Sequence, residues 1–117
     1  MKLWVVDAFC DDTHRGNPAG VCLLEQWPDD NLLGRIAAEI NLSETAFVCR
    51  TPEHYQLRWF SPRCEIELCG HATLASAAVI WRENLENPHH PIIFDTRNGV
   101  FTVFQTPPLI HLKFPLM

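Results

Sequence analysis

The sequence predicts an α+β domain in which a curved, mixed β-sheet wraps around one central apolar helix. Short β-rich runs recur along the chain and are separated by turn-forming residues. A helical run over 70–84 is apolar on nearly every side. A helix of that kind must be surrounded by protein, so we expect the strands to curve around it.

Length, charge and cysteine content narrow the class of protein. The 117 residues fit a single domain spanning 1–117, with enough chain to bury a core. The net charge of -5, with singly scattered cations, argues against a nucleic-acid partner. No apolar run has the roughly 18–20 residues of a membrane span, and Asp7 comes too early for a signal peptide.

The five cysteines favour a reducing, cytoplasmic setting over a disulfide framework. Their number is odd, and no secretion signal accompanies them. None of the cysteines or histidines has the spacing of a metal-ligand pair. We therefore expect no metal site.

The first third of the chain predicts two strands and a helix. We expect strands over 2–9, buried on both faces, and over 19–25, with a turn-rich loop at 10–18 between them. The segment 27–30 has the Pro and Asp residues that suit a helix start, and Asn41 suits a left-handed stop. The apolar stripe of this helix is Leu32, Leu33, Ile36, Ala37 and Ile40.

Three further strands are expected before the apolar helix. Two are the β-rich runs 45–50 and 55–60. In 63–68 apolar and charged residues alternate strictly, which predicts a half-buried strand. The inward-facing residues would be Cys64, Ile66 and Leu68.

A hairpin and a final strand follow the helix. The β-rich runs 92–97 and 100–105 are separated by Asn98-Gly99, a dipeptide typical of a type I′ turn with two positive φ angles. A last strand is expected over 109–114.

The start of the apolar helix is the first candidate site. In Cys69-Gly70-His71-Ala72-Thr73, free N–H groups and the helix dipole would attract a carboxylate or phosphate, and Gly70 would let it approach the backbone. The alternative is a plain helix start at which Thr73 bonds locally. From spacing alone this alternative is favoured, because strand-to-helix turns are common.

Three other residues carry chemistry of the right kind. Glu44, between the first helix and a strand, could carry a proton in a cleft or lie solvated in a loop. Asn17 could orient a ligand or only form a turn. Cys69 could act as a base if the helix start lowered its pKa, or be a small core residue.

Taken together, the motifs resemble the phenazine-biosynthesis-type (PhzF-like) family of isomerases. The order and spacing of the segments fit across essentially the whole chain. Gly-His-Ala-Thr and Ser-Glu-Thr are the most specific of the motifs. The segments are Val6-Asp7-Ala8-Phe9, Gly16-Asn17-Pro18-Ala19-Gly20-Val21, Leu42-Ser43-Glu44-Thr45, Arg58-Trp59-Phe60-Ser61-Pro62, Glu67-Leu68-Cys69-Gly70-His71-Ala72-Thr73, Ile93-Phe94-Asp95-Thr96, Asn98-Gly99 and Lys113-Phe114-Pro115.

The resemblance implies a diaminopimelate epimerase-like fold, with two similar halves and the active site between them. It implies a proton shift on a small carboxylate metabolite, without metal or organic cofactor. Glu44 matches the catalytic glutamate, and His71 matches a residue beside it. The substrate carboxylate would be held by the helix start, Gly70 to Thr73, with Asn17 near it. Cys69 matches one of the two cysteines of the epimerases, but no partner cysteine is found.

The main departure from the family is length, because this chain resembles the first half alone. It could be a truncated gene product, pair with a separately encoded second half, or form a homodimer that imitates the two halves. We expect the homodimer. The alternative to an isomerase is an incomplete half-enzyme that serves as a small-anion-binding or assembly module. The substrate itself cannot be read from this half.

Overall fold

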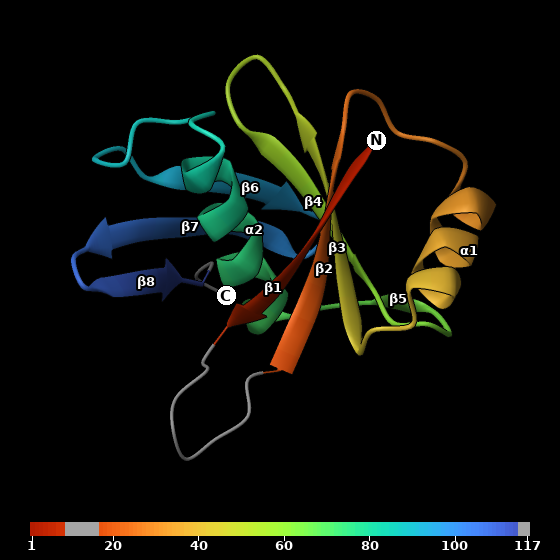
Figure 1. The fold of residues 1–117 in the computed structure, drawn as a ribbon. Helices are drawn as coiled ribbons and strands as arrows, with labels where there is room; N and C mark the ends of the chain where they lie inside the picture. Colours follow the sequence, from red (N-terminus) through yellow and green to blue (C-terminus); the bar gives the residue numbers. More distant parts are fainter. Residues whose placement is uncertain (9–16, 115–117) are drawn as a thin grey trace.

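The computed structural model describes residues 1–8 and 17–114, which form eight strands and two helices (Figure 1). The strands are β1 (Lys2–Ala8), β2 (Asn17–Leu24), β3 (Glu44–Arg50), β4 (Tyr55–Phe60), β5 (Glu65–Ile66), β6 (Ile92–Thr96), β7 (Gly99–Thr106) and β8 (Leu109–Lys113). The helices are α1 (Asp30–Ile40) and α2 (Gly70–Arg82).

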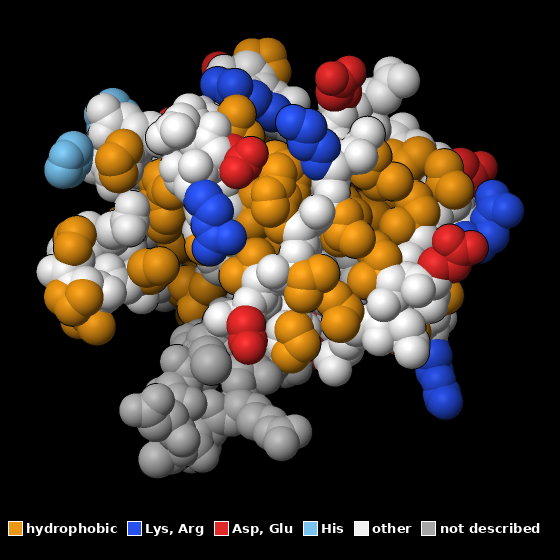
Figure 2. All heavy atoms as spheres, viewed as in Figure 1, with side chains coloured by type: hydrophobic (Ala, Val, Ile, Leu, Met, Phe, Trp, Pro, Cys, Tyr) orange, Lys and Arg blue, Asp and Glu red, His pale blue; other side chains and the backbone are white. Residues whose placement is uncertain are grey.

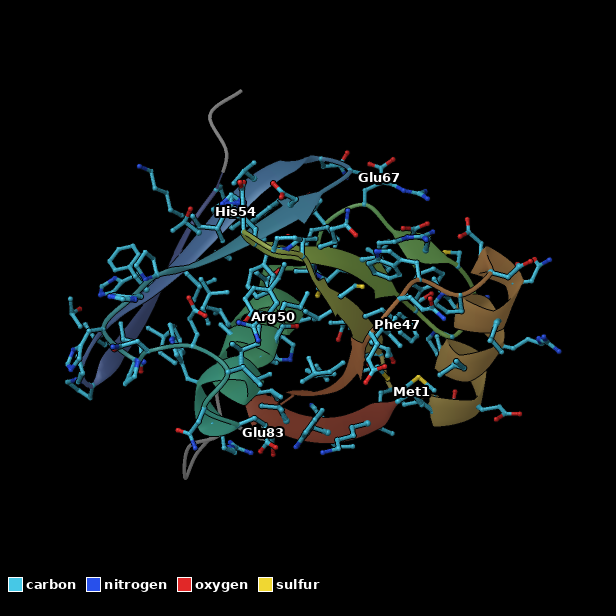
Figure 3. All side chains as sticks on the ribbon, turned by 90° about the horizontal axis from the view of Figure 1, so that it is seen from above. Met1, Phe47, Arg50, His54, Glu67 and Glu83 are labelled. Atoms are coloured by element: carbon cyan, nitrogen blue, oxygen red, sulfur yellow. The ribbon has the colours of Figure 1, made fainter. Side chains whose placement is uncertain are left out.

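The strands form one mixed sheet in the order β1-β2-β3-β4-β6-β7-β8, with the short β5 paired to β4. The β2–β3 and β4–β6 pairs are parallel, and the other neighbours are antiparallel. The sheet curves around α2, while α1 packs on its opposite face (Figures 1 and 3). The predicted fold class, a half-barrel around a central helix, is confirmed.

Helix α2 is enclosed as its composition predicts. Its buried residues come from all sides of the helix: Ala72, Thr73, Ala75, Ser76, Ala77, Val79 and Ile80. The one buried serine hydroxyl among them, on Ser76, donates to the carbonyl oxygen of Ala72 at 2.7 Å, so no polar atom of Ser76 is left unpaired. Small residues let the strands approach the helix closely.

Helix α1 has the predicted boundaries. The Asp29 carboxylate caps it by accepting a hydrogen bond from the Asn31 N–H at 2.7 Å. Asn41 ends it in the left-handed conformation, with φ 57°. Leu33 and Ala37 pack on Phe47, which projects from β3 toward this helix (Figure 3).

Strand β1 is not buried on both faces, so that prediction is wrong. Its inner residue Val6 belongs to the core, but Leu3 and Val5 are exposed on the outer face. β1 is an edge strand of the sheet, and α1 packs over β3 and β4 instead. Figure 2 shows hydrophobic side chains gathered over the centre of this side of the molecule. The next strand begins at Asn17, earlier than expected, and most of the predicted loop lies outside the described residues.

The predicted strand over 63–68 is reduced to Glu65–Ile66. Its alternation is misleading because Cys64 and Leu68 are exposed, and only Ile66 packs against the core. The Ser61 hydroxyl accepts hydrogen bonds from the N–H groups of Arg63 and Cys64, both at 3.1 Å. This local turn takes up Arg63 and Cys64, so the strand begins only at Glu65.

The hairpin of β6 and β7 is confirmed, but its turn differs from the prediction. Thr96 pairs with Gly99, so the two turn residues are Arg97 and Asn98. Among the described residues, positive φ at a non-glycine occurs only at Asn41 and Asn84, which excludes a type I′ turn here. Gly99 instead takes φ 117° as the first residue of β7. The Thr96 hydroxyl stabilises this arrangement by accepting from the Asn98 N–H at 3.1 Å and donating to the Gly99 carbonyl oxygen at 2.8 Å.

Candidate functional site

The predicted site segments meet at one end of the half-barrel. β2 and β3 run parallel, and Ala19 pairs with Glu44, so both strands begin at this end. Two residues into β3, Ala46 pairs with Trp59 of β4. The Trp59 indole Nε1 donates to Thr73 Oγ1 at 3.0 Å and thereby fixes the first turn of α2 above the start of β3.

Glu44 lies beneath this helix start. It is the first residue of β3 and shares the face of Ala46, which packs in the core around α2. Its Oε2 atom is buried and has no hydrogen-bond partner in the described part of the chain. A buried carboxylate oxygen without a donor is costly in free energy, so this atom is a candidate for contact with a ligand.

The first turn of α2 is capped by Cys69. The Cys69 Sγ accepts from the Ala72 N–H at 3.5 Å, and the Cys69 carbonyl oxygen accepts from the Thr73 N–H at 3.1 Å and from Thr73 Oγ1 at 2.8 Å. Thr73 therefore bonds locally, as the plain helix start predicts, and the N–H groups of Ala72 and Thr73 both donate within the cap. Gly70 and His71 remain partly exposed at this end of the helix.

Of the two readings of Cys69, the structure favours a small buried residue over a thiol whose pKa the helix start lowers. Burial raises the pKa of this thiol above its ordinary value, and the negative charge of Glu44 raises it further. The N–H groups of Ala72 and His71 act in the opposite direction but do not outweigh burial. Cys69 is thus a protonated thiol near neutral pH, and the thiolate form that a base requires is scarce.

Gly70 has a packing role that the sequence did not reveal. A Cβ atom at this position would lie 3.3 Å from Leu112 Cδ2 and 3.6 Å from Phe114 Cζ, so the helix start lies directly against the end of β8. The sequence predicts this glycine as room for a ligand, and the structure adds that a side chain here would come close to Leu112 and Phe114.

Sequence analysis also missed the aromatic residues around the helix start. Trp59 packs edge-on against Phe101, with ring centroids 5.5 Å apart, and Phe101 packs edge-on against Phe114 at 5.7 Å. Trp59 and Phe114 both stand in segments that carry the family resemblance, which is the only sequence signal that pointed to them. Their contacts join three elements far apart in sequence.

The structure gives less detail on two other predicted site residues, Asn17 and His71. Asn17 begins β2, and its backbone pairs with Ala8. Its side chain lies outside the described residues. His71 lies in the first turn of α2, next to the Cys69 cap.

The described residues contain no group of three or more His, Cys, Asp or Glu side chains that could hold a metal ion. Within the same residues, neither helix is long and apolar enough to cross a membrane.

One protein-family model matches nearly the whole chain, including the motif segments. The model of the family described as "Phenazine biosynthesis-like protein" matches residues 6–114. The chain belongs to this family. Its motif segments, including Glu44 and the Gly70–Thr73 turn, all fall within the matched region apart from the last residue of the Lys113-Phe114-Pro115 segment.

Curated relatives of this phenazine biosynthesis-like chain are about twice as long. An uncharacterized isomerase of Halalkalibacterium halodurans is 45% identical over 97% of this chain, which covers 43% of the relative. An uncharacterized isomerase of Pseudomonas aeruginosa is 45% identical over 98% of this chain and 44% of its own length. A human phenazine biosynthesis-like domain-containing protein is 40% identical over 99% of this chain, which covers 43% of the relative. The chain therefore spans less than half the length of these relatives.

Solved structures of the same family have the same fold. A PhzF-family protein of Enterococcus faecalis matches with a TM-score of 0.85 and 36% identity, over 98% of this chain and 47% of that one. A putative PhzC/PhzF protein of Clostridium difficile matches with a TM-score of 0.84 and 44% identity, over 92% of this chain and 41% of that one. A predicted epimerase of Pseudomonas aeruginosa, at 18% identity and a TM-score of 0.74, shares the fold alone.

Proposed function

We propose that this chain carries the proton-moving half of a cofactor-independent isomerase that acts on a small carboxylate. Glu44 is the general base and acid, and the start of α2 at Gly70 and His71 binds the substrate carboxylate. The observation that carries the proposal is the buried, unpartnered Oε2 of Glu44 beside that helix start. The isomerase names of two relatives support the same reaction class.

The proposed reaction moves one proton and needs no oxidant or reductant. Glu44 removes a proton from a carbon next to the unsaturated part of the substrate, and the C–H electron pair moves into that unsaturated system. The Glu44 carboxyl then returns the proton to another carbon, where a new C–H bond forms. The helix dipole at the Gly70 end of α2 stabilises the negative charge that develops.

Glu44 suits this role because of its position in the fold. It stands at the first residue of a core strand, so the backbone that carries it is fixed by pairing with β2 and β4. One of its oxygens is already removed from water, which favours proton transfer over solvation. Cys69 serves beside it as the cap of α2, not as the base, because its pKa is raised. Ala72 and Thr73 belong to the same first turn of α2, and we propose that Asn17, at the start of β2, helps to bind the carboxylate.

The other side of the cleft must come from a partner. We propose a second copy of this chain, which would bring two helix starts face to face; a separately encoded second half is the alternative. The exposed apolar side chain of Leu68 beside the site supports a partner, since it is 49% exposed.

The test is deuterium uptake from D₂O into a panel of small unsaturated carboxylates. The wild-type chain is expected to exchange a carbon-bound proton, and Glu44→Gln to slow the exchange by about 100-fold or more. Glu39→Gln, on the exposed face of α1, is the matched control and should leave the rate unchanged. Equal rates for wild type and Glu44→Gln would refute the assignment of Glu44.

A second function has its own signature in the same experiment. If carboxylates bind the chain with equal affinity in wild type and Glu44→Gln, and neither exchanges a proton, the chain is a small-anion-binding or assembly module.

A further inference from the structure

The ring of Phe114 lies beside the helix start that the proposed function assigns to the substrate carboxylate. It approaches the position of a Gly70 Cβ to 3.6 Å through Cζ and to 4.0 Å through Cε1. Glu44 approaches the same helix start from β3, and Phe114 does so from the far end of the sheet, beyond β8. A molecule seated at the first turn of α2 therefore has a carboxylate on one side and an aromatic ring on the other.

The orientation of this ring is held by the core. Phe114 packs edge-on against Phe101, with an angle of 68° between the ring planes, and Phe101 is fully buried. Phe101 in turn packs against Trp59, whose indole is hydrogen-bonded to Thr73 of the helix start. The rings of Phe114, Phe101 and Trp59 thus connect the exposed Phe114 ring to the first turn of α2. These contacts fix the positions of the ring and the turn before a ligand binds.

Half of the Phe114 side chain is nevertheless left open. Phe101 is 1% exposed, whereas Phe114 is 51% exposed, so its own domain uses only part of its apolar surface. The other exposed phenylalanine of the hairpin, Phe104, lies on the outer face of the sheet and stacks on His111 with ring centroids 4.8 Å apart. Phe104 therefore faces away from the face of the sheet that packs on α2 and offers a matched control.

We propose that Phe114 is a specificity-determining residue of this site, favouring carboxylates with a flat, unsaturated carbon skeleton over saturated or highly polar ones. The inference rests on the proposed function, because it takes the start of α2 as the carboxylate position. An aromatic ring offers a planar apolar surface on which a second flat skeleton stacks, and a puckered or charged skeleton gains less from it.

The experiment measures the affinity of three probes for the full chain labelled with ¹⁵N, by following the amide signals of Gly70 and His71. Acetate reports the carboxylate alone, cyclohexanecarboxylate adds a puckered ring, and benzoate adds a flat ring. The wild-type chain is expected to bind benzoate about five-fold more tightly than acetate, with cyclohexanecarboxylate between them. Phe114→Leu should reduce the benzoate preference to near unity and leave acetate binding unchanged, and Phe104→Leu should change neither.

The other outcomes separate this inference from the proposed function. If acetate binds at Gly70 and Phe114→Leu leaves the benzoate preference intact, the role of Phe114 is refuted while the carboxylate site stands. If Phe114→Leu only lowers the native mass in solution, Phe114 belongs to an interface between copies, and the inference is overturned. If none of the probes shifts the amide signals of wild type, the carboxylate site fails, and this inference fails with it.

Discussion

The Trp59 indole Nε1 donates a hydrogen bond to Thr73 Oγ1 at 3.0 Å, and this bond joins strand β4 to the first turn of α2. Both side chains are buried. Thr73 Oγ1 donates in turn to the Cys69 carbonyl oxygen, so the indole, the hydroxyl and the helix cap form one chain of bonds. The position of the helix start relative to Glu44 depends on this connection.

Replacing Trp59 by Phe should therefore destabilise the chain. The variant loses one buried hydrogen bond and part of a buried ring, which together cost roughly 1–3 kcal/mol of unfolding free energy. The measurement is urea unfolding followed by circular dichroism. Trp27→Phe removes the same atoms from an exposed bond, between Trp27 Nε1 and Gln56 Oε1, and should cost about 0.5 kcal/mol or less. Equal losses for the two variants would contradict the special role of Trp59.

Arg58 and Glu65 form the strongest ion pair that the structure describes between β4 and β5. Two guanidinium nitrogens, Nε and Nη2, donate to the two Glu65 oxygens at 2.8 and 2.7 Å. The hydrogen bonds from Arg58, opposed by burial and aided by the charge of Arg58, lower the pKa of Glu65 below its ordinary value. A lowered carboxyl pKa stabilises the fold above the ordinary pKa, and this stability is lost as the pH falls through the lowered value.

Glu65→Gln should accordingly reduce stability at pH 7 and flatten its pH dependence. We expect a loss of about 1–3 kcal/mol at pH 7, since the Arg58 side chain is 12% exposed and would be left poorly paired. The difference from wild type should shrink in unfolding experiments carried out progressively below pH 4.5. Glu67→Gln, at an exposed position, is the control. A difference that stays constant with pH would contradict the assignment.

Cys69 should react slowly with thiol reagents at neutral pH. Burial raises its pKa, so little thiolate is present, whereas Cys64 is exposed. Iodoacetamide labelling followed by peptide mass spectrometry is expected to modify Cys64 first and Cys69 later. Cys22, whose pKa burial raises to about 11, should be protected until the chain unfolds. Faster labelling of Cys69 than of Cys64 would show that the helix start activates it after all.

The proposed second copy predicts the native mass. Light scattering on a sizing column should give twice the 13.4 kDa chain mass across a concentration series. Leu68→Asp places a charge beside the site and should shift the chain to a monomer that is still folded. Leu32→Asp, on exposed α1, is the matched control and should leave the dimer intact. A wild-type chain that is monomeric at every concentration would exclude the homodimer and favour a separately encoded partner.

Much of the fold follows from local signals. The all-round apolar pattern of 70–84 predicts an enclosed helix, and Asn41 ends α1 as its left-handed propensity predicts. Two turns were not predicted, the one at Ser61 and the one at Arg97-Asn98. In each, a side-chain hydroxyl, of Ser61 or Thr96, bonds to a nearby backbone N–H and competes with the expected backbone pairing.

The site was only partly predictable for a different reason. Glu44 and the Gly70 turn were identified by their motifs, and the sheet brings them together. The raised pKa of Cys69 and the contact of Gly70 with Phe114 arise from burial and from packing between distant strands, which no spacing rule encodes. The charge pattern along a single segment cannot reveal them.

The most direct test of the account is the rate of deuterium exchange per chain, measured over the same concentration series as the native mass. If Glu44 moves a proton in a cleft completed by a second copy, the wild-type rate per chain rises with the dimer fraction, and Glu44→Gln stays slow throughout. If exchange is the same for wild type and Glu44→Gln at every concentration, Glu44 is not the proton carrier, and the central claim is wrong.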